Sequence, residues 1–211
     1  LGVADPARIG VDEPRDADAN PGGPSVPPGD YQMTVKFRGS EAATPVRVLA
    51  DPRAKNTDAE WQTRWSAILE AGRLRDSLVT AIERLRSIRA DVDAITTRVK
   101  ESNAERLRRR EVKEDELPLL ADAKKLQEAL TTLEKKLWQP PGTVGILAER
   151  DVLTKLFYVQ GYLESSWDAP SEAHLEYLRQ ARRKVEEAVA EVNQFYAEQV
   201  GPFRDQVRAS G

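Results

Sequence analysis

The sequence predicts a mainly α protein: a long antiparallel helical bundle, coiled-coil-like, with four helices in about three limbs and a small β-hairpin before them. Two observations support this fold class. Apolar residues recur at steps of three and four over long stretches, which is typical of helices that pack along one seam. An earlier segment instead alternates apolar and polar residues, which is typical of a half-buried strand.

The first helix is predicted over residues 57–103, where no proline interrupts the apolar spacing. Thr57 is a candidate N-cap, and Glu60 lies at capping-box distance from it. About 45 residues at about 1.5 Å each give a rod of roughly 65–70 Å, which must pack lengthwise against other helices. Its seam consists of Trp61, Trp65, Ile68, Leu78, Ile82, Leu85, Ile88, Val92, Ile95 and Val99.

Three further helices are predicted at about residues 116–138, 147–165 and 172–207. Pro118 fits the first turn of the earliest of them. We expect the two shorter helices to return along the first helix as one broken limb, because together they nearly match its length. The last helix runs out again, with a bend or brief break at Pro202. The clean heptad seam of residues 116–138 is Leu119, Ala123, Leu126, Leu130, Leu133 and Leu137.

The chain divides into three parts by composition: an extended Pro/Gly-rich arm or linker at residues 1–29, a β-hairpin at 30–52 and the helical bundle at 56–211. A lone hairpin is marginal in water. We therefore expect it to rest on the start of the first helix near Trp61 and Trp65, or to pair with another molecule. Its apolar face comprises Tyr31, Met33, Val35, Phe37, Val46 and Val48, of which Val35, Phe37, Val46 and Val48 are the candidate interaction surface.

Composition excludes several kinds of chemistry. The 211 residues include no Cys, so disulfides, thiolate catalysis and Cys-bound metals are excluded. A net charge of −3 with 32% charged residues gives no general attraction to nucleic acid or to an anionic membrane. No apolar run approaches the roughly 18 residues of a membrane span. The chain begins at Leu1 without a signal segment, which suggests a piece of something longer.

One dense basic cluster, a candidate basic tip, follows the first helix and consists of Arg106, Arg108, Arg109 and Arg110. It offers an alternative function, an anion-binding or nucleic-acid-binding coiled coil. Glu and Asp residues surround the cluster and cancel its charge, and no aromatic residue interleaves to stack on a base. We expect a solvated turn between helices and no nucleic-acid partner.

No catalytic constellation is visible. Acid pairs such as Asp91 and Asp93 lie on helix faces that we expect to be exposed, where carboxylates serve solubility and ion pairing. His174 is the single His and follows a predicted helix start. We therefore expect no enzyme activity, no metal and no cofactor. Sugar stacking is a further hypothesis for the four tryptophans, for which we expect core roles: Trp61, Trp65, Trp138 and Trp167.

Four passages together resemble a known family: PGDYQMTV (28–35), VRVLADPR (46–53), LEKKLWQPPG (133–142) and LFYVQGYLESSWDAPS (156–171). They are similar to the C-terminal region of large bacterial BNR-repeat glycosyl hydrolases, also described as sortilin-like β-propeller proteins. The resemblance covers about residues 27–205. Trp167 departs from it, because it interrupts the Ser-Ser-Asp that is usual there.

In that family the hairpin completes a small Ig-like sandwich after the propellers, and a long helical tail follows. This chain contains no propeller repeat and no Asp-box sequence, so hydrolase activity does not transfer to it. The resemblance implies a non-catalytic C-terminal structural or protein-interaction module of an exported protein, periplasmic or extracellular. Its partners would be its own upstream propeller domains or another protein, with self-association through the hairpin. A carbohydrate-binding or glycosidase-associated fragment is the alternative.

Overall fold

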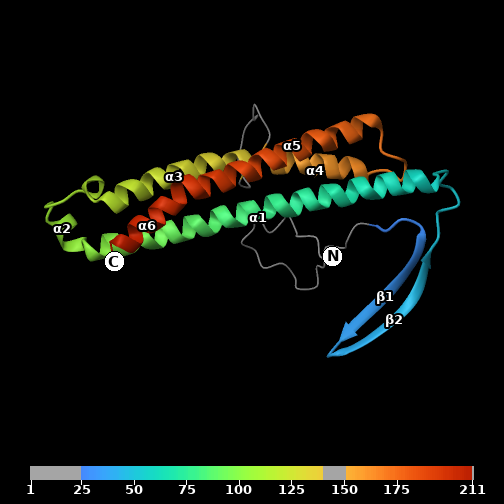
Figure 1. Cartoon of the computed structure of the whole chain (residues 1–211), viewed down its shortest axis with the longest axis horizontal. Helices are drawn as coiled ribbons and strands as arrows, with labels where there is room; N and C mark the ends of the chain where they lie inside the picture. Colours follow the sequence, from blue (N-terminus) through green and yellow to red (C-terminus); the bar gives the residue numbers. More distant parts are fainter. Residues whose placement is uncertain (1–24, 140–150, 211) are drawn as a thin grey trace.

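The computed structural model describes residues 25–139 and 151–210 (Figure 1). The protein is mainly α with a small β-hairpin, as the sequence predicts. Most of the expected N-terminal arm and the start of the helix expected at 147–165 lie outside the described residues. The hairpin strands are β1 (Gly29–Phe37) and β2 (Ser40–Val48). The long helices are α1 (Asp58–Ser102), α3 (Pro118–Leu137), α4 (Val152–Glu164) and α5 (Glu172–Phe195).

Helix α1 is continuous over 45 residues. Its first turn is closed by a capping box: the Glu60 amide donates to Thr57 Oγ1 at 3.3 Å, and the Thr57 amide donates to Glu60 Oε2 at 2.7 Å. At its far end a short helix α2 (Ala104–Arg108) and a 3₁₀ turn η2 (Glu114–Glu116) lead into α3. The rod expected from the unbroken seam is thus formed by one helix.

The helices make three limbs. Both α3 and α4 pack along α1, and α5 packs against α1 and α4 (Figure 1). One core runs through all of them because each helix turns its apolar stripe inward. In α3 the buried first-turn residue is Leu120, whereas Leu119 is half-buried. The most completely buried side chains are Leu78, Ile82, Leu85, Val92, Leu130, Leu137, Leu156, Val185 and Val192.

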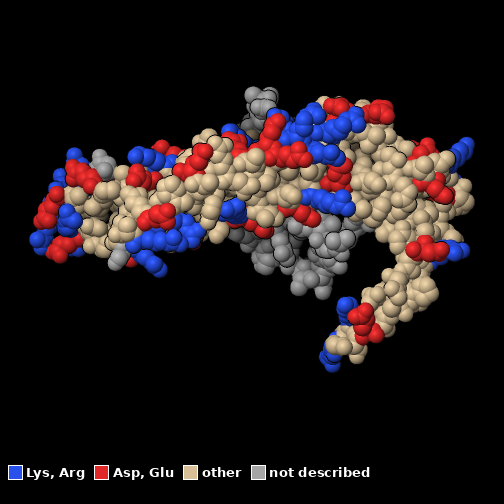
Figure 2. Space-filling model, in the orientation of Figure 1, with Lys and Arg blue, Asp and Glu red and all other residues tan. Residues whose placement is uncertain are grey.

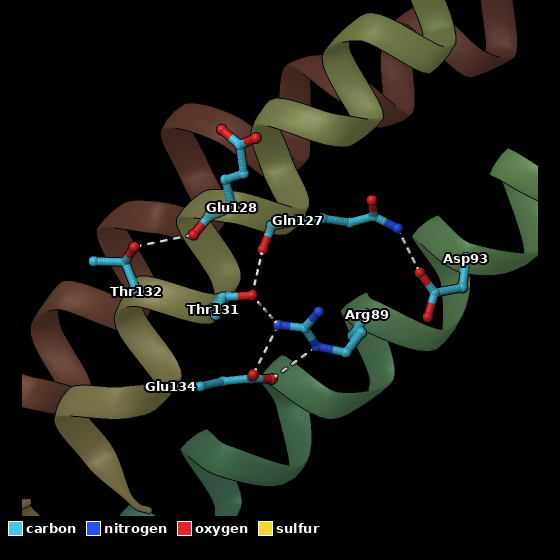
Figure 3. Close-up of polar contacts among 7 residues, drawn as sticks. All are labelled: Arg89, Asp93, Gln127, Glu128, Thr131, Thr132 and Glu134. Carbon is cyan, nitrogen blue, oxygen red and sulfur yellow. Dashed lines mark hydrogen bonds and ion pairs between the residues drawn. The ribbon is translucent and has the colours of Figure 1, made fainter. Parts of the chain in front are cut away.

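A polar network fixes the alignment of α1 with α3 (Figure 3). The Arg89 guanidinium donates to both Glu134 carboxylate oxygens, at 2.8 and 3.2 Å, and to Thr131 Oγ1 at 3.0 Å. About one turn along, Gln127 donates to Asp93 at 2.6 Å. A slide of α3 by one turn would break these bonds, so the network specifies register where the leucine seam alone would tolerate shifts.

The expected interruption at Pro202 takes the form of a π turn. Helix α5 passes through η3 (Tyr196–Val200) into α6 (Gly201–Ala209) without leaving its helical path. Pro202 has no N–H for the regular bond to the fourth preceding carbonyl, and the wider turn accommodates that loss. Phe203 is buried beyond the turn, so the apolar stripe resumes.

The hairpin stands away from the bundle (Figure 1). Nearly all residues of both strands are exposed, so the expectation that it rests on the start of the first helix is wrong. At the bundle end, Trp61 packs edge-on against Trp167 at a centroid distance of 6.2 Å, and no hairpin residue takes part in that contact.

Candidate interaction site

The apolar face of the hairpin is the candidate site. The register pairs Tyr31 with Val46 and Val35 with Ala42, and directly opposed residues point to the same face of a sheet. Val35, Phe37, Val46 and Val48 therefore share one face, as the sequence predicts. The exposed fractions are 67% for Phe37, 57% for Val35, 53% for Met33 and 37% for Val46. Exposed apolar clusters are typical of interaction sites, so this face is the candidate site.

The opposite face of the hairpin is polar and internally paired. Arg47 makes a bidentate contact with Asp30, directly across the strands, at 2.6 and 3.0 Å. Lys36 pairs with Glu41, also directly opposite, at 3.1 Å. The Asp30 carboxylate raises the pKa of the Arg47 guanidinium, because the bond favours the charged form. The charged residues of this face can remain in contact with water, whereas the opposite face of the hairpin is apolar.

The hairpin joins the bundle at a rigid end. Asn56, just before α1, donates from its side-chain amide to the carbonyl of Trp167. Arg64 is 7% exposed and donates from Nε to the Ser166 carbonyl at 2.9 Å. Its guanidinium also lies 5.7 Å from the centre of the Trp167 ring. Burial lowers the pKa of Arg64, although the charge of Glu164 opposes that shift. The loop after α4 thus holds the start of α1.

The candidate basic tip lies at the other end of the rod. Arg109 pairs with Glu105 and lies 3.9 Å from Glu111, while Arg106 donates to Asn103 at 3.2 Å. Figure 2 shows positive and negative side chains intermixed there. Arg108 and Arg110 lie in the same turn, among these carboxylates. On the face that Figure 2 shows, the tip is therefore of mixed charge and differs from the continuous basic surface that binds a nucleic-acid backbone.

The candidate catalytic residues are dispersed. The His174 ring stacks on Tyr162, with centroids 5.8 Å apart and planes at 2°. Asp93 accepts a bond from Gln127 in the register network. Within residues 25–139 and 151–210, no cluster of three or more His, Asp or Glu side chains is placed to hold a metal ion. These placements favour structural roles for the residues concerned.

The four tryptophans do not form a platform. Trp61 is buried at 6% exposure, and Trp65 is half-buried on the same helix. Trp138 ends α3 under the Arg86 guanidinium, 4.6 Å from the ring centre. Trp167 follows α4, beside Trp61 near the start of α1, and is 62% exposed. Trp61 bears out the expectation of a core role, whereas Trp167 does not.

A tyrosine-lined groove between α4 and α5 is a feature that the sequence analysis missed. Tyr158, Tyr162 and Tyr177 are 42%, 48% and 49% exposed and border a hollow of about 580 Å³ with Lys155 and Arg183. The sequence feature that could have indicated the groove is the four-residue spacing of Tyr158 and Tyr162 within one predicted helix. Phe157, in the same helix, is 63% exposed.

No family model, curated protein or solved structure matches this chain. The similarity to BNR-repeat and sortilin-like proteins therefore stays a prediction. In the part of the chain that the structure describes, no helix combines the length and apolarity needed to cross a bilayer.

Proposed function

We propose that this chain is a non-catalytic structural and protein-interaction module at the C-terminal end of a larger exported β-propeller protein. The hairpin makes the contact with the upstream domains or with another protein, and the helical bundle is the support that presents it. The single structural observation that supports the interaction role is the two-sided hairpin, with an exposed apolar face behind a paired polar face. The β-propeller parent is proposed from the sequence resemblance of residues 27–205 alone.

The energetics favour a covered hairpin. Fully burying a Val, Met or Phe side chain contributes about 1.5–3 kcal/mol. Two strands alone are marginal in water and gain stability from further strands or from a packing surface. An Ig-like sandwich supplies such a surface, because its sheets pack about 10 Å apart with the polar faces outward. The apolar face suits the interior of a sandwich, and the Asp30–Arg47 and Lys36–Glu41 face suits its outside.

The bundle suits a supporting role. Most of its aliphatic side chains lie in its own core, and its polar network aligns α1 with α3. At about 1.5 Å per residue the 45 residues of α1 extend roughly 68 Å from the hairpin end to the tip. A rod of this kind sets distance and orientation between what binds at its ends.

The test is binding between this chain and the propeller region encoded upstream in the same gene, expressed separately. The double variant Val35→Ser and Phe37→Ser should weaken binding at least about tenfold, because two apolar anchors are lost. Lys36→Gln, on the polar face of the same strand, is the matched control and should bind normally. Equal binding by the native chain, the double variant and Lys36→Gln would refute the role of the apolar face in binding. A gene without upstream propeller repeats would refute the proposal that the chain belongs to a β-propeller protein.

A second candidate function is carbohydrate binding, which the tyrosine groove between α4 and α5 favours. Exposed aromatic rings beside polar side chains suit the apolar faces and hydroxyls of sugars. Titration with a panel of bacterial-wall and plant oligosaccharides should then give saturable binding that Tyr177→Ala removes. Binding that persists in that variant would exclude the groove.

A further inference from the structure

We infer that the outer edge of β1 pairs antiparallel with β1 of a second copy of this chain, giving a four-stranded sheet across a two-fold axis. The pairing concerns the edge of the hairpin and does not depend on the function proposed for its apolar face. Three observations lead to it: the turn that sets the hydrogen-bond pattern, a proline on the other strand, and the order of charges along β1.

The turn determines which backbone groups point outward. Arg38 and Gly39, the two central residues, have φ of 47° and 83°, as in a type I′ turn. Such a two-residue turn is closed by a hydrogen-bonded pair, here Phe37 with Ser40. Along the ladder, hydrogen-bonded pairs alternate with non-hydrogen-bonded pairs. Residues of β1 in the non-hydrogen-bonded pairs direct their N–H and C=O groups away from β2, and these residues are Asp30, Gln32, Thr34 and Lys36.

The two edges of the hairpin are not equivalent. By the same alternation the outward groups of β2 belong to Glu41, Ala43, Pro45 and Arg47. Pro45 has no N–H, so it interrupts any ladder on that side. Each outward residue of β1 retains its N–H, and no described strand other than β2 lies beside β1. One open edge and one protected edge favour a closed dimer over an extended fibre.

The charges on β1 complement a second copy. Antiparallel pairing with Met33 at the two-fold axis is the one register that pairs all nine residues of β1. It sets Asp30 against the partner's Lys36, and Tyr31 against the partner's Val35. Since Asp30 already pairs with Arg47 and Lys36 with Glu41, charges alternate across the four strands in two symmetric rows. Opposite charges directly across strands stabilise a sheet, and like charges destabilise it.

The pairing also enlarges the apolar face. Directly opposed residues point to the same side, so the exposed Met33, Val35 and Phe37 of both copies form one surface. That surface is twice as large as the face of a single hairpin and remains available to a partner. Edge pairing and face burial are therefore compatible.

Site-directed cross-linking of the full chain tests the register, since the native sequence has no Cys. Met33 opposes its own copy in a non-hydrogen-bonded pair, where Cα atoms lie about 4.5 Å apart, within disulfide range. Mild oxidation of Met33→Cys should give a reducible covalent dimer in high yield. Val35→Cys, on the same face, is the control: its two copies would lie roughly 13 Å apart along the strands, so it should give no covalent dimer.

Each other outcome overturns the inference. Equal cross-linking of both variants would indicate unspecific contact between faces, and no cross-linking of Met33→Cys would exclude the register. Sedimentation velocity gives a second measurement. Lys36→Glu opposes the partner's Asp30 with a like charge and should lower the dimer fraction severalfold. Lys55→Glu, the same charge change on an exposed residue outside the hairpin, should not. Equal dimer fractions in the two would refute the charge pairing.

Discussion

The bundle and the hairpin use the same kinds of residue in opposite ways. In the bundle Leu78, Ile82 and Leu85 have no exposed surface, whereas in the hairpin Val35 and Phe37 are 57% and 67% exposed. The bundle closes its core with its own helices, but two strands offer no second layer. The difference teaches that the buried core that supplies stability lies in the bundle, whereas the hairpin leaves its apolar residues free for the contact proposed above. Mutations should therefore separate the two properties.

The largest expected effect is in the bundle core. Leu130→Ala removes a fully buried side chain of α3 and should lower the free energy of unfolding by about 2–5 kcal/mol, because the cavity cannot fully collapse. Urea unfolding followed by circular dichroism at 222 nm measures it. Leu49, 77% exposed after the hairpin, provides the control, since Leu49→Ala should change little. If Leu130→Ala lowers the free energy of unfolding by less than about 0.5 kcal/mol, the seam of α3 faces water and the prediction is wrong.

The next effect concerns the register network. Glu134→Ala leaves Arg89, whose side chain is only 32% exposed, without its carboxylate, and should cost about 1–3 kcal/mol. Glu128→Ala is the matched control on the same helix, because the Glu128 side chain points away from α1 (Figure 3). Urea melts of the pair measure the difference. Equal stability of the two variants would mean that the leucine seam alone sets the register.

A smaller effect is expected at the first turn of α1. Thr57→Ala removes the N-cap acceptor and should cost about 1 kcal/mol in thermal or urea unfolding. The bonds from the Thr57 amide and hydroxyl lower the pKa of Glu60, so the contribution of the Glu60 carboxylate is present above the ordinary Glu pKa and is lost as pH falls through the lowered value. The cap bond from the Glu60 amide to Thr57 Oγ1 does not titrate, so the difference between the variant and the native chain should narrow in acid without vanishing. Thr57→Ser keeps the acceptor and should retain stability at neutral pH.

The sequence predicted the bundle well because its information is local and periodic. Unbroken three-and-four spacing predicted α1 as one helix, and Thr57 with Glu60 predicted how it begins. Periodicity did not predict that Tyr158, Tyr162 and Tyr177 stay partly exposed, because burial depends on how neighbouring helices pack and not only on spacing within one helix. Local sequence pattern also did not predict the position of the hairpin, and it did not predict the contact at the bundle end between Trp61 and Trp167, which are more than a hundred positions apart.

The smallest expected effect sharpens the comparison most. Phe→Ala in a core costs about 3–5 kcal/mol, yet Phe37→Ser should change the unfolding free energy of the isolated chain by less than about 0.5 kcal/mol. The reason is that Phe37 is 67% exposed and contacts no helix core. Urea melts at low protein concentration, where copies do not pair, measure the effect of Phe37→Ser on the unfolding free energy of the single chain. A loss of several kcal/mol would mean that the hairpin packs on the bundle in solution, so that both regions share one core and the separation of stability from recognition fails.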